Sequence, residues 1–174
     1  MSVTQEEKAA AFRALHHGRG AFVIPNPWDV GSARILAGLG FQALATSSAA
    51  SAAAIGRKDR GLTRDEALAH ARLIVGATDL PVSADLENGF GDTPDSVAET
   101  VRLAAEVGLV GCTIEDSTGI SENPLYDFDV AVARIAAAAR VARRLPFPFV
   151  LTAGAQLRLR QSELDRHDQT ASRL

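Results

Sequence analysis

The segment over residues 81–91 reads Pro81-Val-Ser-Ala-Asp-Leu-Glu-Asn-Gly-Phe-Gly91, and it is predicted to begin as a buried strand and end as a polar loop with two glycines. Side chains alternate between the two faces of a strand, so Ser83, Asp85 and Glu87 are expected to share one face. Two carboxylates at the end of a buried strand are costly to bury unless something neutralises them. Mg²⁺ is one candidate, because hard cations choose carboxylate oxygens. The alternative is that one carboxylate caps the following loop while the other is solvated.

Apolar strands and amphipathic helices alternate strictly on both sides of this segment. Five strands are predicted, over residues 21–24, 41–46, from Pro81 onwards, 110–114 and 149–152. Helices are predicted over residues 4–17, from Asp29 or Ser32 to Gly38, from Thr63, from Thr93 to Gly108 and over residues 127–144. This alternation is typical of an α/β protein with a parallel sheet.

Polar and acidic residues stand at the carboxyl ends of four predicted strands. They are Asn26 and Asp29, Ser47 and Ser48, Asp85 and Glu87, and Glu115 and Asp116. In open parallel sheets and in closed barrels this edge carries the functional site. The sequence has neither a glycine fingerprint after the first strand nor a Walker motif, which argues against a dinucleotide-binding or P-loop domain.

A third carboxylate is predicted to join the pair on the 81–91 segment. Parity places Thr113 and Glu115 on one face of the next strand, and adjacent parallel strands lie about 4.8 Å apart. Unpaired, the three carboxylates would repel and one would tend to bind a proton, whereas Mg²⁺ would hold one or two directly and the rest through water. Asp59 can reach the cluster from a charged loop between glycines, which is either a solvated loop or a lid. Cys112 falls on the opposite face and is predicted to be a small core residue.

The composition suits one ordinary domain of 174 residues with a formal charge of −3. This near-neutral charge does not favour a nucleic-acid or membrane-surface partner. The single cysteine fits a reducing compartment. The polar N-terminus does not resemble a signal peptide, and no apolar run is long enough to cross a bilayer. We therefore expect a cytoplasmic protein.

Five short motifs together carry a resemblance to a known family. They are Asn26-Pro-Trp-Asp29, Thr46-Ser-Ser48, Gly56-Arg-Lys-Asp59, Ala84-Asp-Leu-Glu-Asn-Gly-Phe-Gly91 and Cys112-Thr-Ile-Glu-Asp116. In this order, over roughly residues 5–152, the sequence resembles the phosphoenolpyruvate mutase/isocitrate lyase superfamily. The resemblance implies a (β/α)8 TIM barrel with Mg²⁺ at its C-terminal face, usually in a homotetramer. It also implies a lyase or mutase that acts on a 2-oxo acid or phosphonate-type carboxylate, with C–C or P–C bond chemistry through a metal-stabilised enolate.

The resemblance also implies roles for single residues. Asp85, Glu87 and Glu115 match the acids around the metal, and Asp59 matches a catalytic loop acid near it. Substrate binding is implied for Thr46, Ser47, Ser48 and Asn88. Within that group, Ser47 and Ser48 match the turn whose backbone N–H groups hold the substrate carboxylate. Independently of the family, chelation by Mg²⁺ would stabilise an oxyanion as negative charge develops.

The sequence departs from the family pattern at two places. Over residues 117–126 it has no Cys, Lys or Arg, whereas the lyase branches carry a Cys-containing basic motif there. This argues against a true isocitrate or methylisocitrate lyase and favours the members labelled carboxyphosphonoenolpyruvate mutase or phosphonomutase. At the fifth strand, Thr152-Ala-Gly-Ala-Gln156 replaces a Thr-Ala-Arg-x-Glu-like sequence. The arginine that neutralises the substrate is therefore absent from its position.

The composition changes at Gly154. Residues 1–153 are predicted to form the N-terminal part of the barrel, about its first five β/α units, and residues 154–174 an atypical polar tail that is helical or disordered. Because the motif and the periodicity are lost together, we expect a chain truncated by a frameshift, a premature stop or a misjoined gene model. Raw sheet edges would favour self-association, and an open α/β sheet is the alternative fold.

Three functions are consistent with these patterns. The first is the Mg²⁺-dependent lyase or mutase, although the missing arginine counts against turnover. The second is a truncated, non-catalytic remnant that at most binds Mg²⁺ or a small carboxylate. The third is a small open-sheet regulatory module with an acidic Mg²⁺ pocket, and it ranks last because Thr152-Ala-Gly-Ala offers no lysine after the fifth strand.

Overall fold

The computed structural model describes residues 3–155, so the predictions for the polar tail fall almost wholly outside the described residues. The helices in this part are α1 (Gln5–His17), α2 (Val30–Gly38), α3 (Ser48–Ala54), α4 (Arg64–Ala77), α5 (Pro94–Glu106) and α6 (Phe128–Ala142). The strands are β1 (Leu44–Ala45), β2 (Val82–Asp85), β3 (Gly111–Glu115), β4 (Ser117–Ile120), β5 (Asn123–Leu125) and β6 (Val150–Gly154).

Four of the strands form one parallel sheet in the order β1-β2-β3-β6. The register places Asp85 opposite Thr113 on one side of β3. On its other side, Glu115 lies opposite Gly154. The predicted α/β fold with a parallel sheet is confirmed. The segment after β3, expected to be a loop, instead contains the antiparallel hairpin of β4 and β5.

The segment over residues 21–24 is not a strand, although the sequence predicts one. Among the described residues, the segment that follows is tied to β1 by one backbone hydrogen bond, from Ala45 N to Pro25 O (3.1 Å), whereas a strand needs a ladder of such bonds. Its apolar character has another cause, since Phe22 and Ile24 pack against the small core that includes Phe12 of α1.

Capping residues start the helices where the sequence signals them. Thr4 and Glu7 exchange hydrogen bonds between side chain and backbone at the start of α1. Thr63 and Glu66 form the same capping box at α4, and Thr93 caps α5, whose first residue is a proline. Such caps satisfy backbone N–H groups that the first helical turn leaves free.

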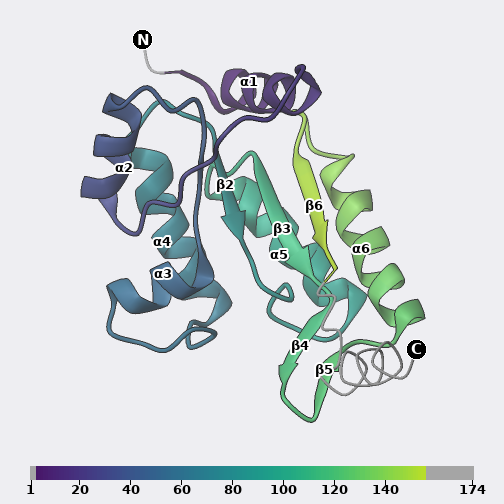
Figure 1. The fold of residues 1–174 in the computed structure, drawn as a ribbon. Coiled ribbons are helices and arrows are strands. Elements are labelled where there is room, and N and C mark those ends of the chain that lie inside the picture. Colours follow the sequence, from purple (N-terminus) through teal and green to yellow (C-terminus); the bar gives the residue numbers. More distant parts are fainter. Residues whose placement is uncertain (1–2, 156–174) are drawn as a thin grey trace, which may run out of the picture.

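The helices α4, α5 and α6 lie side by side along one face of the sheet, and α1 lies across its amino end (Figure 1). Between sheet and helices lies a buried core that includes Leu68, Ile74, Val82, Ala84, Val101, Cys112 and Ile114. Burial raises the pKa of Cys112 to about 12, so its thiol stays protonated. The prediction that Cys112 is a core residue is confirmed.

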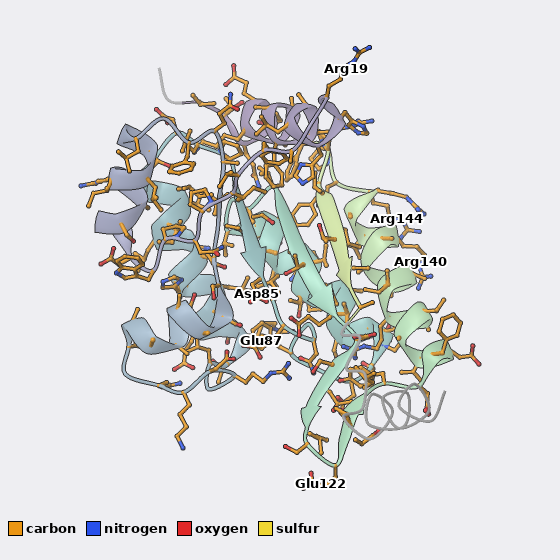
Figure 2. All side chains as sticks on the ribbon, in the orientation of Figure 1. Arg19, Asp85, Glu87, Glu122, Arg140 and Arg144 are labelled. Atoms are coloured by element: carbon orange, nitrogen blue, oxygen red, sulfur yellow. The ribbon has the colours of Figure 1, made fainter. Side chains whose placement is uncertain are left out.

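The carboxyl ends of β2 and β3 point away from α1, toward α3 and the following loop on one side and the β4–β5 hairpin on the other (Figure 1). Asp85 and Glu87 lie at this end of the sheet (Figure 2). None of the described helices is both long enough and apolar enough to cross a membrane.

Candidate active site

Asp85 ends β2 with both carboxylate oxygens bound to backbone N–H groups. Its Oδ2 accepts a hydrogen bond from Ser48 N and its Oδ1 accepts one from Glu87 N, each at 3.0 Å. Ser48 is the first residue of α3, which directly follows β1. The pairing of β1 with β2 therefore fixes the orientation of the Asp85 carboxylate.

Glu87 lies beside Asp85 for a reason that differs from the sequence argument. The strand ends at Asp85, and Glu87 sits in the following turn with a φ of 51°, a left-handed conformation that few residues other than glycine adopt. The turn is closed by a hydrogen bond from Gly89 N to Leu86 O (2.7 Å). The expectation that Glu87 continues the strand alternation is wrong, because the turn and not the strand brings it to the carboxylate cluster.

The Glu87 side chain is in an electrostatically unfavourable place. The residue is only 8% exposed. Burial first, and then the charge of Asp85, raise its pKa to about 7, with smaller contributions in the same direction from Asp59 and Glu115. The charge of Arg60 acts in the opposite direction. Among the described residues, none donates a hydrogen bond to the Glu87 carboxylate.

Glu115, at the end of β3, is paired with an arginine from a distant loop. Arg60 Nη2 lies 3.3 Å from Glu115 Oε2 and donates to Ser117 Oγ at 2.9 Å. The Arg60 and Glu115 side chains are 33% and 21% exposed. The guanidinium thus joins the loop over residues 56–61 to the start of β4.

Asp59 lies in the same loop, next to Arg60. Its Oδ1 accepts a hydrogen bond from Arg60 N (2.9 Å). Asp59 is exposed, yet its charge still acts on Glu87. The structure therefore brings Asp59 toward the cluster, and its catalytic role stays a prediction.

The turn after β1 faces Asp85. Thr46 Oγ1 accepts a hydrogen bond from Asp85 N (3.3 Å), and Ser47 Oγ caps α3 by accepting one from Ala50 N (3.4 Å). The N–H group of Ser48 is engaged by the Asp85 carboxylate. Thr46 and Ser48 thus contact Asp85 directly, and the substrate-binding roles of all three residues stay predictions.

Asn88 uses both ends of its side-chain amide within the protein. Its Nδ2 donates to Tyr126 Oη (3.0 Å), and its Oδ1 accepts from Phe90 N (3.0 Å). Tyr126 in turn donates to Asp92 Oδ1 (2.6 Å). In this structure Asn88 thus orders the loop after β2, and the predicted contact with substrate stays a prediction.

Arg134 of α6 binds the same loop through its backbone carbonyl groups. The residue is 1% exposed. Its guanidinium donates to the carbonyl oxygens of Asn88 and Gly91 and lies 3.9 Å from the centre of the Tyr126 ring. Buried carbonyl groups need such donors, so Arg134 holds the two-glycine loop in place.

Sequence reasoning assigned no role in the site to either arginine. A signal existed for Arg134, because its nearest neighbours along the Ala-rich helix are all apolar, and a charged residue on a buried helix face needs a partner. Arg60 stood in a run of charged residues, and the sequence does not distinguish it from the neighbouring Arg57.

The donor set fits Mg²⁺ in chemistry, although it is not assembled around an ion. Within residues 3–155, no three His, Cys, Asp or Glu side chains already form a group that could hold a metal ion. Asp85 and Glu87 offer the carboxylate oxygens that hard cations prefer, and the Glu87 carboxylate has no donor from the described residues. Glu115 shares its Oε2 with Arg60, so an ion bound there would compete with the guanidinium for this carboxylate.

Known proteins are similar to this chain in sequence and in fold. A sequence profile of the family described as phosphoenolpyruvate phosphomutase matches residues 12–174. An uncharacterised protein of Mycobacterium tuberculosis (strain ATCC 25618 / H37Rv) is 36% identical over 141 residues, which are 80% of this chain and 51% of that protein.

Two solved structures resemble the chain closely. One, assigned as a lyase/mutase from Burkholderia cenocepacia J2315, has a TM-score of 0.88 and 56% identity, and the match covers 96% of this chain and 60% of that one. The other is 2,3-dimethylmalate lyase, a PEP mutase/isocitrate lyase superfamily member, with a TM-score of 0.79 and 30% identity over 99% of this chain and 61% of that one.

The chain spans about half the length of the curated relatives it matches. Its α/β fold is that of the TIM-barrel-type members of the superfamily, of whose chains it covers part. The profile match over residues 12–174 and the similarity to solved members show that the chain belongs to the phosphoenolpyruvate mutase/isocitrate lyase superfamily of lyases and mutases.

Proposed function

We propose that this chain carries the Mg²⁺-binding part of a lyase or mutase that acts on a 2-oxo acid or a phosphonate-type carboxylate. The observation that carries the proposal is the placement of Asp85 and Glu87 at the end of β2, beside the strand β3 that ends at Glu115, where the pKa of Glu87 is raised to about 7. Burial first, and then neighbouring negative charge, raise this pKa, and a bound divalent cation would favour the ionised carboxylate. Such clusters are typical of functional sites.

Asp85 is the carboxylate best prepared to bind an ion. Each of its oxygens accepts one backbone hydrogen bond, and a carboxylate oxygen has a second lone pair for a cation. Glu87 is the second candidate ligand because its carboxylate lacks a donor from the described residues. Glu115 is the third, directly or through water. Bound there, Mg²⁺ would supply the positive charge that stabilises an oxyanion while a C–C or P–C bond is cleaved or formed.

The residues around the acids suit a small carboxylate ligand. Asp59 is the exposed acid of the cluster, so it is placed to meet a substrate first, and we assign it the catalytic role. The turn of Thr46, Ser47 and Ser48 and the amide of Asn88 border the same end of the sheet, and we assign them to the substrate side. The solved relative named 2,3-dimethylmalate lyase supports a substrate of this class. We also propose that the protein is cytoplasmic and forms a homo-oligomer.

A second candidate function is binding of Mg²⁺ and a small carboxylate without turnover. The observation that favours it is the missing arginine at the end of β6. The family resemblance implies an arginine there, but Gly154 lies opposite Glu115 at this end of the strand. A site that holds the ion but lacks a cation for the substrate would bind without aligning the reacting bond.

The experiment is a calorimetric titration of Mg²⁺ into the purified 174-residue chain, without and with oxalate, whose two carboxylates resemble the enolate of a 2-oxo acid. We expect saturable binding that oxalate tightens. The variant Asp85→Ala should lose the binding heat, because it removes the best-oriented ligand.

The matched control is Asp95→Asn, which removes an exposed carboxylate from the first turn of α5 and should leave Mg²⁺ binding unchanged. Absence of Mg²⁺ binding by the folded wild-type chain, in both the presence and the absence of oxalate, would contradict both candidate functions.

A further inference from the structure

Arg60 brings a positive charge to the carboxylate cluster from a loop far away in sequence. Its Nη2 contacts Glu115 Oε2 at 3.3 Å and Ser117 Oγ at 2.9 Å. Arg57, three residues earlier in the same loop, is already bound to Glu66 at 2.6 Å. Arg60 is therefore the arginine of this loop whose charge is directed at the site.

The end of β6 contributes no such charge in the described residues. Gly154 lies opposite Glu115, and a Cβ built on it would lie 3.5 Å from Glu115 Cγ. A side chain there would start beside the cluster, but the residues on either side of Gly154 are alanines. Three carboxylates and one divalent ion carry net negative charge, so an anionic ligand needs a further cation to bind well.

We propose that Arg60 is a specificity-determining residue that binds the anionic group of the substrate, an inference that rests on the proposed function. In this structure its guanidinium pairs with Glu115. When Glu115 turns to the metal ion, the planar fork of N–H donors becomes available to a carboxylate or phosphonate, which it matches in geometry.

The ion pair between Arg60 and Glu115 is weak enough for the guanidinium to change partners. The ion pair is long, and both side chains are partly exposed, so it is worth little by itself. The backbone of Arg60 is fixed instead, with a φ of 62° and a closing hydrogen bond from Gly61 N to Lys58 O (2.9 Å). The loop thus holds the base of the side chain while the guanidinium can move between partners.

Gly119 in the β4–β5 hairpin leaves room for the guanidinium. A Cβ at this position would lie 2.8 Å from Arg60 Nη1, which is closer than real contacts allow. Gly119 also has a φ of 79°, which favours glycine for a second reason. The hairpin therefore accommodates Arg60 at the edge of the cluster.

The test compares oxalate binding, at saturating Mg²⁺, by wild type, Arg60→Gln and Arg60→Lys in calorimetric titrations. Loss of charge-assisted hydrogen bonds should weaken oxalate binding about tenfold or more in Arg60→Gln. Arg60→Lys should be intermediate, because it keeps the charge without the fork. Mg²⁺ affinity in the absence of oxalate should be equal or higher in Arg60→Gln, since a competitor for Glu115 is gone.

The control Lys58→Gln removes a charge from the same loop at an exposed position and should leave oxalate binding as in wild type. Equal oxalate affinity in wild type and Arg60→Gln would overturn the inference and leave the proposed function intact. Parallel loss of Mg²⁺ and oxalate binding in Arg60→Gln, or a Lys58→Gln variant as weak as Arg60→Gln, would also overturn it. A wild-type chain that binds neither Mg²⁺ nor oxalate would instead contradict the proposed function itself.

Discussion

Two arginines border the carboxyl end of the sheet, and the structure uses them in opposite ways. Arg134 is buried, and its Nη1 and Nη2 donate to carbonyl groups of the loop after β2. Arg60 is partly exposed and is shared between a carboxylate and a hydroxyl group. One side of the candidate site is therefore locked by the fold, while the other side is held by contacts that a ligand can replace.

The difference follows from what each guanidinium binds. The carbonyl groups of Asn88 and Gly91 are partly buried and accept their hydrogen bonds from the buried Arg134, so loss of Arg134 would leave polar groups of this loop without their partner. A carboxylate at the surface can accept water or a metal ion instead. The comparison predicts that the two regions respond very differently to substitution.

The largest effect is expected for Arg134→Met, which keeps the apolar stem but removes the donors to Asn88 and Gly91. We expect a loss of about 3 kcal/mol in unfolding free energy, since two carbonyl groups lose their partner. Urea denaturation measures this loss. Arg140→Met, an exposed position on the same helix, should change stability by less than about 0.5 kcal/mol. Equal costs for both variants would remove the distinction between a locking and a surface arginine.

The second effect concerns the pH dependence of the metal-free chain. The folded pKa of Glu87 is raised to about 7 from a usual 4.5, so the folded state favours the protonated carboxyl. The stability contributed by this group is complete below about pH 4.5 and is lost as the pH rises through about 7.

With a chelator present, Glu87→Gln should therefore be about 1–3 kcal/mol more stable than wild type at pH 8, and this gain should shrink as the pH falls toward 4.5. Chemical denaturation at several pH values measures the difference. Glu122→Gln, in the connection between β4 and β5, is the control and should show no such trend. A pH-independent difference between wild type and Glu87→Gln would rule out the crowded carboxylate cluster.

A smaller effect is expected for Tyr126→Phe on the locked side. The phenol oxygen links Asn88 Nδ2 to Asp92 Oδ1, and burial first, then the bond to Asp92, raise the pKa of Tyr126. Removing the hydroxyl group should cost about 1 kcal/mol in unfolding free energy, measured by urea denaturation. A cost near zero would show that the loop depends on Arg134 alone.

The smallest effect is expected for Arg60→Gln without ligands. The ion pair with Glu115 is partly exposed, so its loss should change the unfolding free energy by no more than about 0.5 kcal/mol. Thermal or urea unfolding of the metal-free variant measures this. A destabilisation comparable to that of Arg134→Met would mean that Arg60 is structural and not exchangeable.

Local signals predicted much of the fold from sequence. The capping boxes at Thr4 and Thr63, and the proline after Thr93, mark helix starts that the structure reproduces. These features depend on residues three or four positions apart, so the sequence contains all the information they need. The strand predicted over residues 21–24 is wrong, because apolar residues that pack against α1 give the same sequence pattern as a buried strand.

The candidate site could be predicted only in part, because its acids come from several elements. The alternation of side chains along strands and the order of the strands correctly predicted that Asp85 and Glu115 lie at the same edge of the sheet. The left-handed turn at Glu87 and the reach of Arg60 across the site depend on tertiary contacts. No local pattern in the sequence encodes those contacts.

The most direct test of the account is a crystal structure of the chain grown with Mn²⁺ and oxalate. Mn²⁺ takes oxygen ligands as Mg²⁺ does and is located by its anomalous scattering. We expect one ion bound by Asp85 and Glu87, with Glu115 turned toward it and the Arg60 guanidinium moved from Glu115 to oxalate. A folded chain with no ion at these carboxylates, and with Arg60 still paired to Glu115, would contradict the account.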